Sequence, residues 1–399
     1  MSTISQPAAA EVLPPLVNPG ADLTREEIQR YSRHLLLPEI GRTGQRRLKN
    51  SKVAVMGAGG LGAPVMLYLA AAGVGTIGIV DFDIVEESNL QRQVIHTVSD
   101  VGRLKTTSAA ESIGAINPLV TVVEHRLRLD ATNALQVLGD YDLVVDGTDN
   151  FATRYLVNDA CVILGLPYVW GSIFRFEGQV SVFWANHGPQ YRDVFPHPPP
   201  PGSVPSCAEG GVLGVLCGSI GSTMATEAIK MICGIGRPLL GRLLVYDALE
   251  MSHRLIHVRP DPQGEPVSHL ADYEELCEID PEATTMACPD SQVAAQVLRL
   301  LLDSQQPPWL IDVRESAEFD IVALPGAVLV PLGEITSGRE MPRLRDLAAS
   351  RDLVVYCKSG ARSASAVQVL QEAGLCNVTH LKGGILEWIS LLDQSLPTY

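Results

Sequence analysis

The chain has 399 residues, 46% of them hydrophobic, and a formal net charge of −15. This length predicts two domains, and the acidic balance argues against nucleic acid or an anionic membrane surface as the main partner. No apolar run is long enough to span a bilayer, and the first residues lack the charged start and apolar core of a signal peptide. We therefore expect a cytoplasmic protein whose residues 1–22 form a disordered tail.

The ordered part of the chain is expected to begin with a helix. A capping-box pattern at 24–27 opens a helix that extends to about Leu37. Helical spacing then turns Ile28, Tyr31 and Leu35 toward the core.

A strand–glycine–helix–strand pattern follows. A short apolar strand at 52–56 leads into a glycine run at 57–62, a helix at 63–72 and a second strand at 76–80. This βαβ unit requires parallel strands. Further strands are expected at 120–123, 143–146, 168–169 and 180–184.

Two polar stretches divide the rest of the chain. Residues 186–211 are rich in Pro and Gly and too long for a simple connection, so they predict a functional lid or crossover loop. The acidic stretch 261–286 predicts a linker between an α/β domain at 23–260 and a smaller α/β domain at 287–399. Within the smaller domain, helices are expected at 292–303, 362–373 and from Ile385, and strands at 310–313, 353–356 and 378–381.

The glycine run lies where a nucleotide site requires it, between a strand and a helix start. Glycine lets the backbone approach phosphate, and the helix N-terminus offers free N–H groups to the anion. Asp81 ends the second strand, where a carboxylate can accept hydrogen bonds from ribose hydroxyls. The commonest ligand of such a pattern is NAD, so a dehydrogenase is the alternative to exclude. The glycines expected to form the cradle are Gly57, Gly59, Gly60 and Gly62.

Charged residues downstream favour ATP chemistry. Displacement of pyrophosphate places charge on phosphoryl oxygens, which cations such as Arg92 and Lys105 can stabilise, whereas hydride transfer needs no cation there. Asp149 and Asn150 follow another strand, where a carboxylate is well placed to hold Mg²⁺. Taken singly, the two cations would be interpreted as surface ion pairs and Asp149 as a loop cap.

These residues together resemble the E1-like superfamily, and more closely the MoeB/ThiF adenylyltransferases, over about residues 30–259. The resemblance implies a Rossmann-like fold, a homodimer formed through this domain, Mg²⁺-ATP, and an acyl adenylate at the C-terminal glycine of a ubiquitin-like sulfur carrier. It also implies that Asp149 is the magnesium and catalytic carboxylate and that Arg33 reaches the phosphates of the partner subunit. The positions matched to ATP binding are Gly60, Asp81, Asp83, Ser88, Asn89, Leu90, Gln91, Arg92, Lys105, Asp149 and Asn150.

Two cysteine features distinguish this chain. Many members of that family carry two C-x-x-C pairs that bind zinc, but here the first position reads Gln190–Asp193 and the second has no cysteine, so we expect no zinc. Cys207 lies in the Pro/Gly-rich loop at the position of a family cysteine that can bond to the carrier. As a lone cysteine it is equally well explained as structural, and the resemblance makes it a candidate thioester, acyl-persulfide or resolving residue.

Cys357 carries the chemistry of the second domain. It ends a predicted strand, and the following loop leads to Arg362 and a helix beginning near Ser363. Backbone N–H groups, the helix dipole and the nearby cations Lys358 and Arg362 all favour a thiolate. The loop is C-x4-R, one residue shorter than a phosphate-binding C-x5-R loop, and better sized for a terminal sulfur.

The segment 287–399 resembles a rhodanese domain. The matching pieces are 310–315, 324–327, the Cys357 loop, and Gly383-Gly384 with Trp388. The resemblance implies that Cys357 carries a persulfide and that Arg362 and the loop amides hold its sulfur. The order of the two domains resembles the MoeZ/MoeBR-type proteins.

The resulting hypothesis is an enzyme that adenylates a carrier ending in Gly-Gly and then transfers sulfur from Cys357 to form a thiocarboxylate. Thiosulfate or a cysteine desulfurase would supply the sulfur. Two alternatives remain open: an NAD-dependent oxidoreductase, and an inactive E1-like scaffold with a rhodanese module used for docking.

Overall fold

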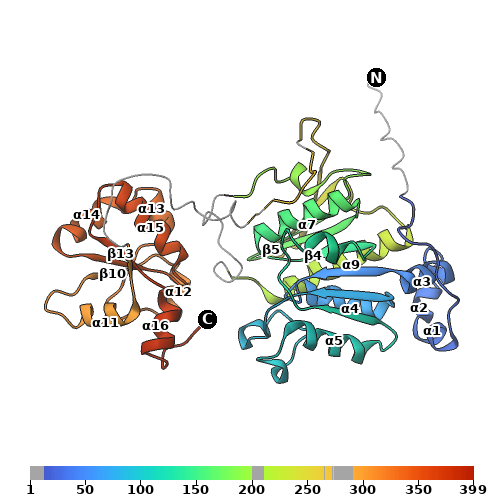
Figure 1. Cartoon of the computed structure of the whole chain (residues 1–399), viewed down its shortest axis with the longest axis horizontal. Coiled ribbons are helices and arrows are strands. Elements are labelled where there is room, and N and C mark those ends of the chain that lie inside the picture. Colours follow the sequence, from blue (N-terminus) through green and yellow to red (C-terminus); the bar gives the residue numbers. More distant parts are fainter. Residues whose placement is uncertain (1–12, 200–210, 265, 272, 274–290) are drawn as a thin grey trace. The chain divides into compact units, whose positions relative to one another are not determined.

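The computed structural model describes residues 13–199, 211–264, 266–271, 273 and 291–399. The chain forms two compact units, of which the second consists chiefly of Asp280–Tyr399 (Figure 1). In the described ranges, no helix combines the length and the apolar character needed to cross a membrane.

The first unit is built on an eight-stranded sheet in the order β3-β2-β1-β4-β5-β6-β7-β8. Its first five strands are parallel, and the last three continue the sheet in antiparallel fashion. The parallel strands are β1 (Lys52–Met56), β2 (Thr76–Val80), β3 (Thr121–His125), β4 (Leu143–Asp146) and β5 (Tyr168–Phe174). The antiparallel strands are β6 (Glu177–Phe183), β7 (Arg242–Asp247) and β8 (Ser252–His257).

Helices cover both faces of this sheet, because its central strands are apolar on both sides. In β1, Val53 and Val55 pack on one face, whereas Ala54 and Met56 pack on the other. The first face is covered by α3 (Gly41–Asn50), α4 (Gly62–Ala72), α5 (Lys105–Ile116) and α9 (Gly214–Cys233). The second is covered by α6 (Ala134–Leu138) and α7 (Phe151–Leu164). The predicted Rossmann-like sheet is confirmed.

The single helix predicted up to Leu37 is wrong. The predicted capping box is present, but α1 (Arg25–Arg30) ends at Tyr31 and is followed by the short α2 (Ser32–Leu35). The Tyr31 ring fills the space beside Gly73, and its hydroxyl accepts a hydrogen bond from Asn117 at 2.9 Å. Ile28, expected in the core, is 36% exposed.

The second unit is a five-stranded parallel sheet in the order β11-β10-β12-β13-β9. One face packs on α13 (Leu332–Thr336), α14 (Met341–Ser350) and α15 (Ala361–Glu372), and the other on α11 (Ala295–Leu302) and α16 (Gly384–Leu392). Figure 1 shows these two groups of helices on opposite sides of the sheet. The strands are β9 (Gln292–Val293), β10 (Trp309–Asp312), β11 (Val328–Leu329), β12 (Leu353–Tyr356) and β13 (Val378–Leu381); α12 (Ser316–Ile321) follows β10.

The predicted helix at 292–303 is wrong at its start. Residues 292 and 293 form β9, which pairs with β13, and the helix begins only at Ala295. The helix expected to begin near Ser363 starts two residues earlier, at Ala361. The strands at 353–356 and 378–381 are confirmed to the residue.

Candidate functional sites

A cavity of about 420 Å³ opens at the carboxyl ends of the parallel strands β1, β2 and β4. This edge of an open α/β sheet is where ligands bind. Ten of the predicted binding residues line it, namely Gly57, Gly59, Gly60, Asp81, Asp83, Asn89, Arg92, Lys105, Asp149 and Asn150. Distant segments of the sequence therefore meet at one cavity.

The glycine loop between β1 and α4 has specific steric requirements. Gly57 has a φ of +84°, a left-handed conformation that favours glycine. Gly62 does not line the cavity, but a Cβ there would lie 1.9 Å from the Gly57 carbonyl oxygen. A Cβ on Gly60 would lie 2.8 Å from Cys217 Sγ. The loop therefore passes closely over α4 and α9 and leaves its backbone exposed to the cavity.

His96, which was not predicted, holds this loop by a hydrogen bond to its backbone. Its Nε2 lies 3.0 Å from the Ala58 carbonyl oxygen, and since a carbonyl can only accept, Nε2 must carry a proton. Its Nδ1 lies 2.7 Å from the Ser108 hydroxyl. Burial lowers the pKa of His96, so the ring is neutral and accepts from Ser108.

Asp81 connects the glycine loop to the end of β2. Its carboxylate accepts hydrogen bonds from the backbone N–H groups of Ala58 and Asp83, both at 2.8 Å. Burial raises the pKa of Asp81, opposed by these hydrogen bonds and by the nearby Lys105 charge. The side chain thus holds the loop in place while it also lines the cavity.

The two predicted cations lie on the cavity wall. The ammonium group of Lys105 is 2.9 Å from Asp83, and Lys105 is only 7% exposed. The guanidinium group of Arg92 donates to the Ser88 carbonyl oxygen at 2.9 Å. Both cations face the cavity, and Lys105 also forms an ion pair with Asp83 at the cavity wall.

Several predicted binding residues lie away from the cavity. Ser88, Leu90 and Gln91 do not line it, although Asn89 between them does. The backbone of Gln91 instead packs against the start of α9 at Gly214. Arg33 is exposed in α2 and does not line the cavity either, so its proposed contact with a partner subunit stays a prediction.

The loop after β4 brings carboxylate and guanidinium groups to the cavity. Asp149 is exposed to it, whereas Asn150 caps α7 by accepting a hydrogen bond from the Thr153 N–H at 2.8 Å. Arg154, not predicted, lines the cavity and donates to the Thr148 carbonyl oxygen at 3.0 Å. Its position one helical turn after Asn150 was a usable signal.

The segment expected to lack zinc is held by an ion pair between the partly exposed Arg192 and the buried Asp159. Arg192 makes two hydrogen bonds to Asp159, at 2.9 and 2.8 Å, and a third to the Tyr273 hydroxyl at 3.1 Å. Asp193 accepts a hydrogen bond from the Asp261 N–H at 2.8 Å. These contacts join 190–193 to the chain beyond β8. Among the described residues, no group of three or more His, Cys, Asp or Glu side chains is placed to hold a metal ion. Cys207 lies outside the described residues.

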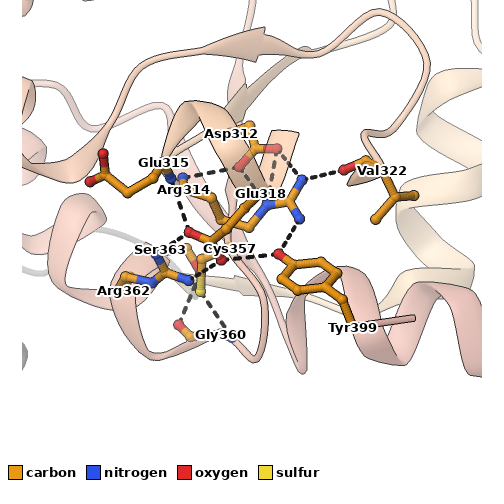
Figure 2. Close-up of polar contacts among 10 residues, drawn as sticks. All are labelled: Asp312, Arg314, Glu315, Glu318, Val322, Cys357, Gly360, Arg362, Ser363 and Tyr399. Atoms are coloured by element: carbon orange, nitrogen blue, oxygen red, sulfur yellow. Dashed lines mark hydrogen bonds and ion pairs between the residues drawn. The ribbon is translucent and has the colours of Figure 1, made fainter. Parts of the chain in front are cut away.

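In the second unit, Cys357 lies at the end of β12 under a tight loop (Figure 2). The residue is only 1% exposed, and its Sγ accepts a hydrogen bond from the Gly360 N–H at 3.1 Å. The Ser363 hydroxyl lies 3.5 Å from the same sulfur. Gly360 has a φ of +106°, and a Cβ on Gly384 would lie 2.5 Å from the Cys357 carbonyl oxygen. These glycines allow the loop to close around the sulfur.

Arg362 is bound to a carboxylate, and the prediction that it helps to hold the sulfur stays a prediction. Its guanidinium group forms a two-bond ion pair with Glu318, at 2.7 and 2.8 Å (Figure 2). Glu318 also accepts from the Tyr399 hydroxyl at 3.0 Å. Burial opposes ionisation of Glu318, but the hydrogen bonds from Arg362, the Glu315 N–H and Tyr399, together with the Arg362 charge, outweigh it and lower the pKa of the carboxyl. Glu318 and Tyr399 were not predicted as residues of this site, because they lie far from the loop along the chain.

The fold and the two sites define an α/β unit with a cavity at the carboxyl ends of its parallel strands, followed by an α/β unit with a buried cysteine in a tight loop. The ThiF family matches residues 31–267, and the rhodanese-like domain matches residues 293–391. The chain belongs to the ThiF family, in the form that carries an additional rhodanese-like domain. Both the predicted family and the predicted fold class are confirmed.

Some similar proteins match nearly the whole chain, and others match about two thirds of it. "Probable adenylyltransferase/sulfurtransferase MoeZ" of Mycobacterium tuberculosis is 56% identical over 391 residues, which are 97% of this chain and 99% of the relative. "Sulfur carrier protein adenylyltransferase" of Thermus thermophilus is 54% identical over 265 residues, 64% of this chain and 98% of the relative. A crystal structure of E. coli MccB with MccA-N7isoASN has a TM-score of 0.55 at 24% identity, covering 60% of this chain and 74% of that one, and supports the fold.

Proposed function

We propose that this chain uses ATP to adenylate the C-terminal carboxylate of a ubiquitin-like sulfur carrier and then supplies sulfur from Cys357 to make a thiocarboxylate. The names of the similar proteins support an enzyme with both activities. The observation that carries the proposal is the single cavity in which the glycine loop, two cations and Asp149 meet.

The first step is displacement at the α-phosphorus. A carboxylate oxygen of the carrier attacks, the bond to the bridging oxygen of pyrophosphate breaks, and the products are acyl-AMP and pyrophosphate. Negative charge grows on the α-phosphoryl and leaving oxygens, where Lys105 and Arg92 stabilise it. The loop at Gly59 and Gly60 can approach phosphate closely because these two residues have no side chains of their own.

Magnesium fits the same site. Asp149 presents an exposed carboxylate to the cavity, and carboxylate and phosphate oxygens are the ligands that Mg²⁺ prefers. When bound, the ion would neutralise part of the polyphosphate charge. Arg154 fixes the Thr148 carbonyl oxygen and so orients the loop that carries Asp149.

The second step joins sulfur to the activated carbonyl. The terminal sulfur of a Cys357 persulfide attacks the acyl carbon, the bond to AMP breaks, and an acyl disulfide forms. A thiol, for which Cys207 is the candidate in this chain, then attacks Cys357 Sγ. The thiocarboxylate leaves and a disulfide remains for an external thiol to reduce. The Gly360 N–H aimed at the Cys357 sulfur stabilises its anionic form.

Further features are proposed on the same basis. They are a homodimer formed through the first unit, thiosulfate or a cysteine desulfurase as sulfur donor, a cytoplasmic location and the absence of zinc. The domain limits at 23–260 and 287–399, with the linker 261–286 between them, also stay proposals. Neither of the alternatives accounts for both sites. A dehydrogenase leaves the Cys357 loop unexplained, and a scaffold leaves the lining of the cavity by Lys105, Arg92 and Asp149 without a purpose.

Pyrophosphate exchange into ATP is the direct test. We expect exchange that depends on a carrier ending in Gly-Gly and on Mg²⁺, and that persists in Cys357→Ala. The same variant should form no thiocarboxylate from thiosulfate, as read by the mass of the carrier. Exchange that is absent with several such carriers would refute adenylation. Normal thiocarboxylate formation by Cys357→Ala would refute the sulfur step.

A further inference from the structure

Tyr399 joins two buried ion pairs beside the cysteine loop. Its hydroxyl donates to the Glu318 carboxylate at 3.0 Å and accepts a hydrogen bond from Arg314 (Figure 2). Glu318 holds Arg362, and Arg314 is bound to Asp312 by several hydrogen bonds. One hydroxyl thus connects α12, the end of β10 and the first turn of α15.

The ring of Tyr399 makes a second set of contacts with the same surroundings. The ammonium group of Lys358, the residue after the cysteine, lies 4.6 Å from the ring centroid. The guanidinium carbon of Arg314 lies 5.7 Å from it. Cations at such distances are attracted to the ring face. Both charged side chains of the Cys357 loop, Lys358 and Arg362, are therefore linked to Tyr399, one directly and one through Glu318.

We propose that Tyr399 is a positioning residue of the sulfur-transfer site, which fixes the loop cations around Cys357. This inference rests on the proposed sulfur transfer. Tyr399 does not touch the sulfur in the described contacts, so it acts through Glu318, Arg362 and Lys358. The hydroxyl donates to the same Glu318 oxygen that accepts from Arg362 Nη2, and so helps to hold the carboxylate where it makes two hydrogen bonds with Arg362.

The hydroxyl is suited to this task at neutral pH. Burial raises the pKa of Tyr399 far above its usual value, so the group keeps its proton and can donate to Glu318. The same oxygen accepts from Arg314, whose guanidinium group is completely buried. A phenylalanine would retain the ring contacts but leave Arg314 and Glu318 each without one hydrogen bond.

Several other charged groups surround the cysteine loop. β10, α12, β13 and α16 pack around the loop, since β10 and β13 pair with β12 and Ile385 donates to the Cys357 carbonyl oxygen. The acidic, basic and histidine side chains on the loop, on these elements and directly beside them include Asp312, Arg314, Glu315, Glu318, Asp320, Lys358, Arg362, His380, Lys382 and Glu387.

The test compares Tyr399→Phe, Tyr399→Ala and the control Ser395→Ala in the full chain. Ser395 donates its hydroxyl to Asp393 in the same segment and has no described bond to the cysteine loop. Two readouts are taken. The first is iodoacetamide alkylation of the Cys357 peptide at pH 7 and pH 9, followed by mass spectrometry. The second is kcat and KM for sulfur transfer from thiosulfate to cyanide.

We expect Tyr399→Phe to remain folded and to lower the ratio of the alkylation rate at pH 7 to that at pH 9 by about threefold, because the loop cations stabilise the thiolate less well. The kcat/KM for thiosulfate should fall by about tenfold, corresponding to one hydrogen bond to a charged group. Tyr399→Ala should lose more in both readouts, and Ser395→Ala should match the wild type.

Two outcomes would overturn the inference: a Tyr399→Phe enzyme equal to the wild type in both readouts, or a Ser395→Ala control with the same losses. Failure of the proposed function is distinguishable. If the wild type transfers no sulfur but the alkylation ratio still depends on Tyr399, the positioning role stands and sulfur transfer fails.

Discussion

Lys105 offers the sharpest test of the adenylation site. Its side chain is 9% exposed, and its ammonium group lies 2.9 Å from the Asp83 carboxylate, which is 52% exposed. Lys105→Ala removes this charge from the cavity wall and leaves Asp83 free to turn toward water. Because that partner is half exposed, the lost ion pair should lower the free energy of unfolding by only about 1 kcal/mol.

The effect on catalysis should be much larger. Removing one preorganised group that stabilises charge in the transition state costs about 2.7–4 kcal/mol, or roughly 10²–10³ in rate. Carrier-dependent exchange of pyrophosphate into ATP should therefore fall by that factor in Lys105→Ala. Lys105→Arg, which keeps the charge, should lose less.

Arg103→Ala is the matched control. Arg103 lies two residues earlier, pairs with Asp100 and Glu111, and does not line the cavity. It should retain wild-type exchange. If folded Lys105→Ala kept its exchange rate within about threefold of the wild type, the electrostatic role assigned to Lys105 would be refuted.

Three further predictions concern stability. The contacts of Glu318, chiefly the hydrogen bond from Arg362, outweigh its burial and lower its pKa below the usual 4.5, so this carboxylate stabilises the folded state above pH 4.5 and the stabilisation is lost as pH falls. The free energy of unfolding of Glu318→Gln, measured with urea, should therefore depend less on acid pH than that of the wild type. An unchanged pH dependence would contradict the lowered pKa. Chelators should leave the Tm unchanged, because we expect the ion pair of Arg192 with Asp159 to take the place of a metal site in this segment. Arg192→Ala should lower the free energy of unfolding by about 3 kcal/mol, because it leaves the buried Asp159 without its ion-pair partner. One zinc per chain, with a Tm that falls on chelation, would contradict this prediction. Gly62→Ala should lower the free energy of unfolding by about 3 kcal/mol or more, because the new Cβ would collide with the backbone of Gly57. Gly59→Ala is the control and should keep the wild-type Tm, because its Cβ would lie 3.7 Å from the nearest atom. Equal Tm values for the two variants would be inconsistent with this packing.

The sequence predicts the central strands well because they are buried on both faces. The apolar runs at 143–146, 353–356 and 378–381 each correspond to one strand without a shift. The errors occur where tertiary contacts override local pattern. Tyr31 ends α1 because its ring packs beside Gly73, and no local signal announces that contact. β9 has only two residues, too few to show the alternation of apolar and polar residues that indicates a strand.

The cavity of the first unit was largely predictable, because its residues follow β1, β2 and β4 and the ends of these parallel strands share one edge of the sheet. The residues missed there, such as His96 and Arg154, act by hydrogen bonds to backbone carbonyl groups. The cysteine site was predictable only as a loop. Glu318, which binds Arg362, lies 44 residues before it, and Tyr399, which binds Glu318, lies 37 residues after Arg362. At such separations the spacing of residues along the chain does not indicate a contact.

The two sites use their cations differently, and the reason lies in what each cation is paired with. In the first unit, Lys105 is paired with a half-exposed Asp83, so incoming phosphate can replace that carboxylate at little cost. In the second unit, Arg362 is paired with Glu318, and both are buried. Separating buried charges is expensive, so this pair should stay closed throughout sulfur transfer. The sulfur of Cys357 is then stabilised by the Gly360 N–H and by a fixed field, and Arg362 contributes to that field from its place on Glu318.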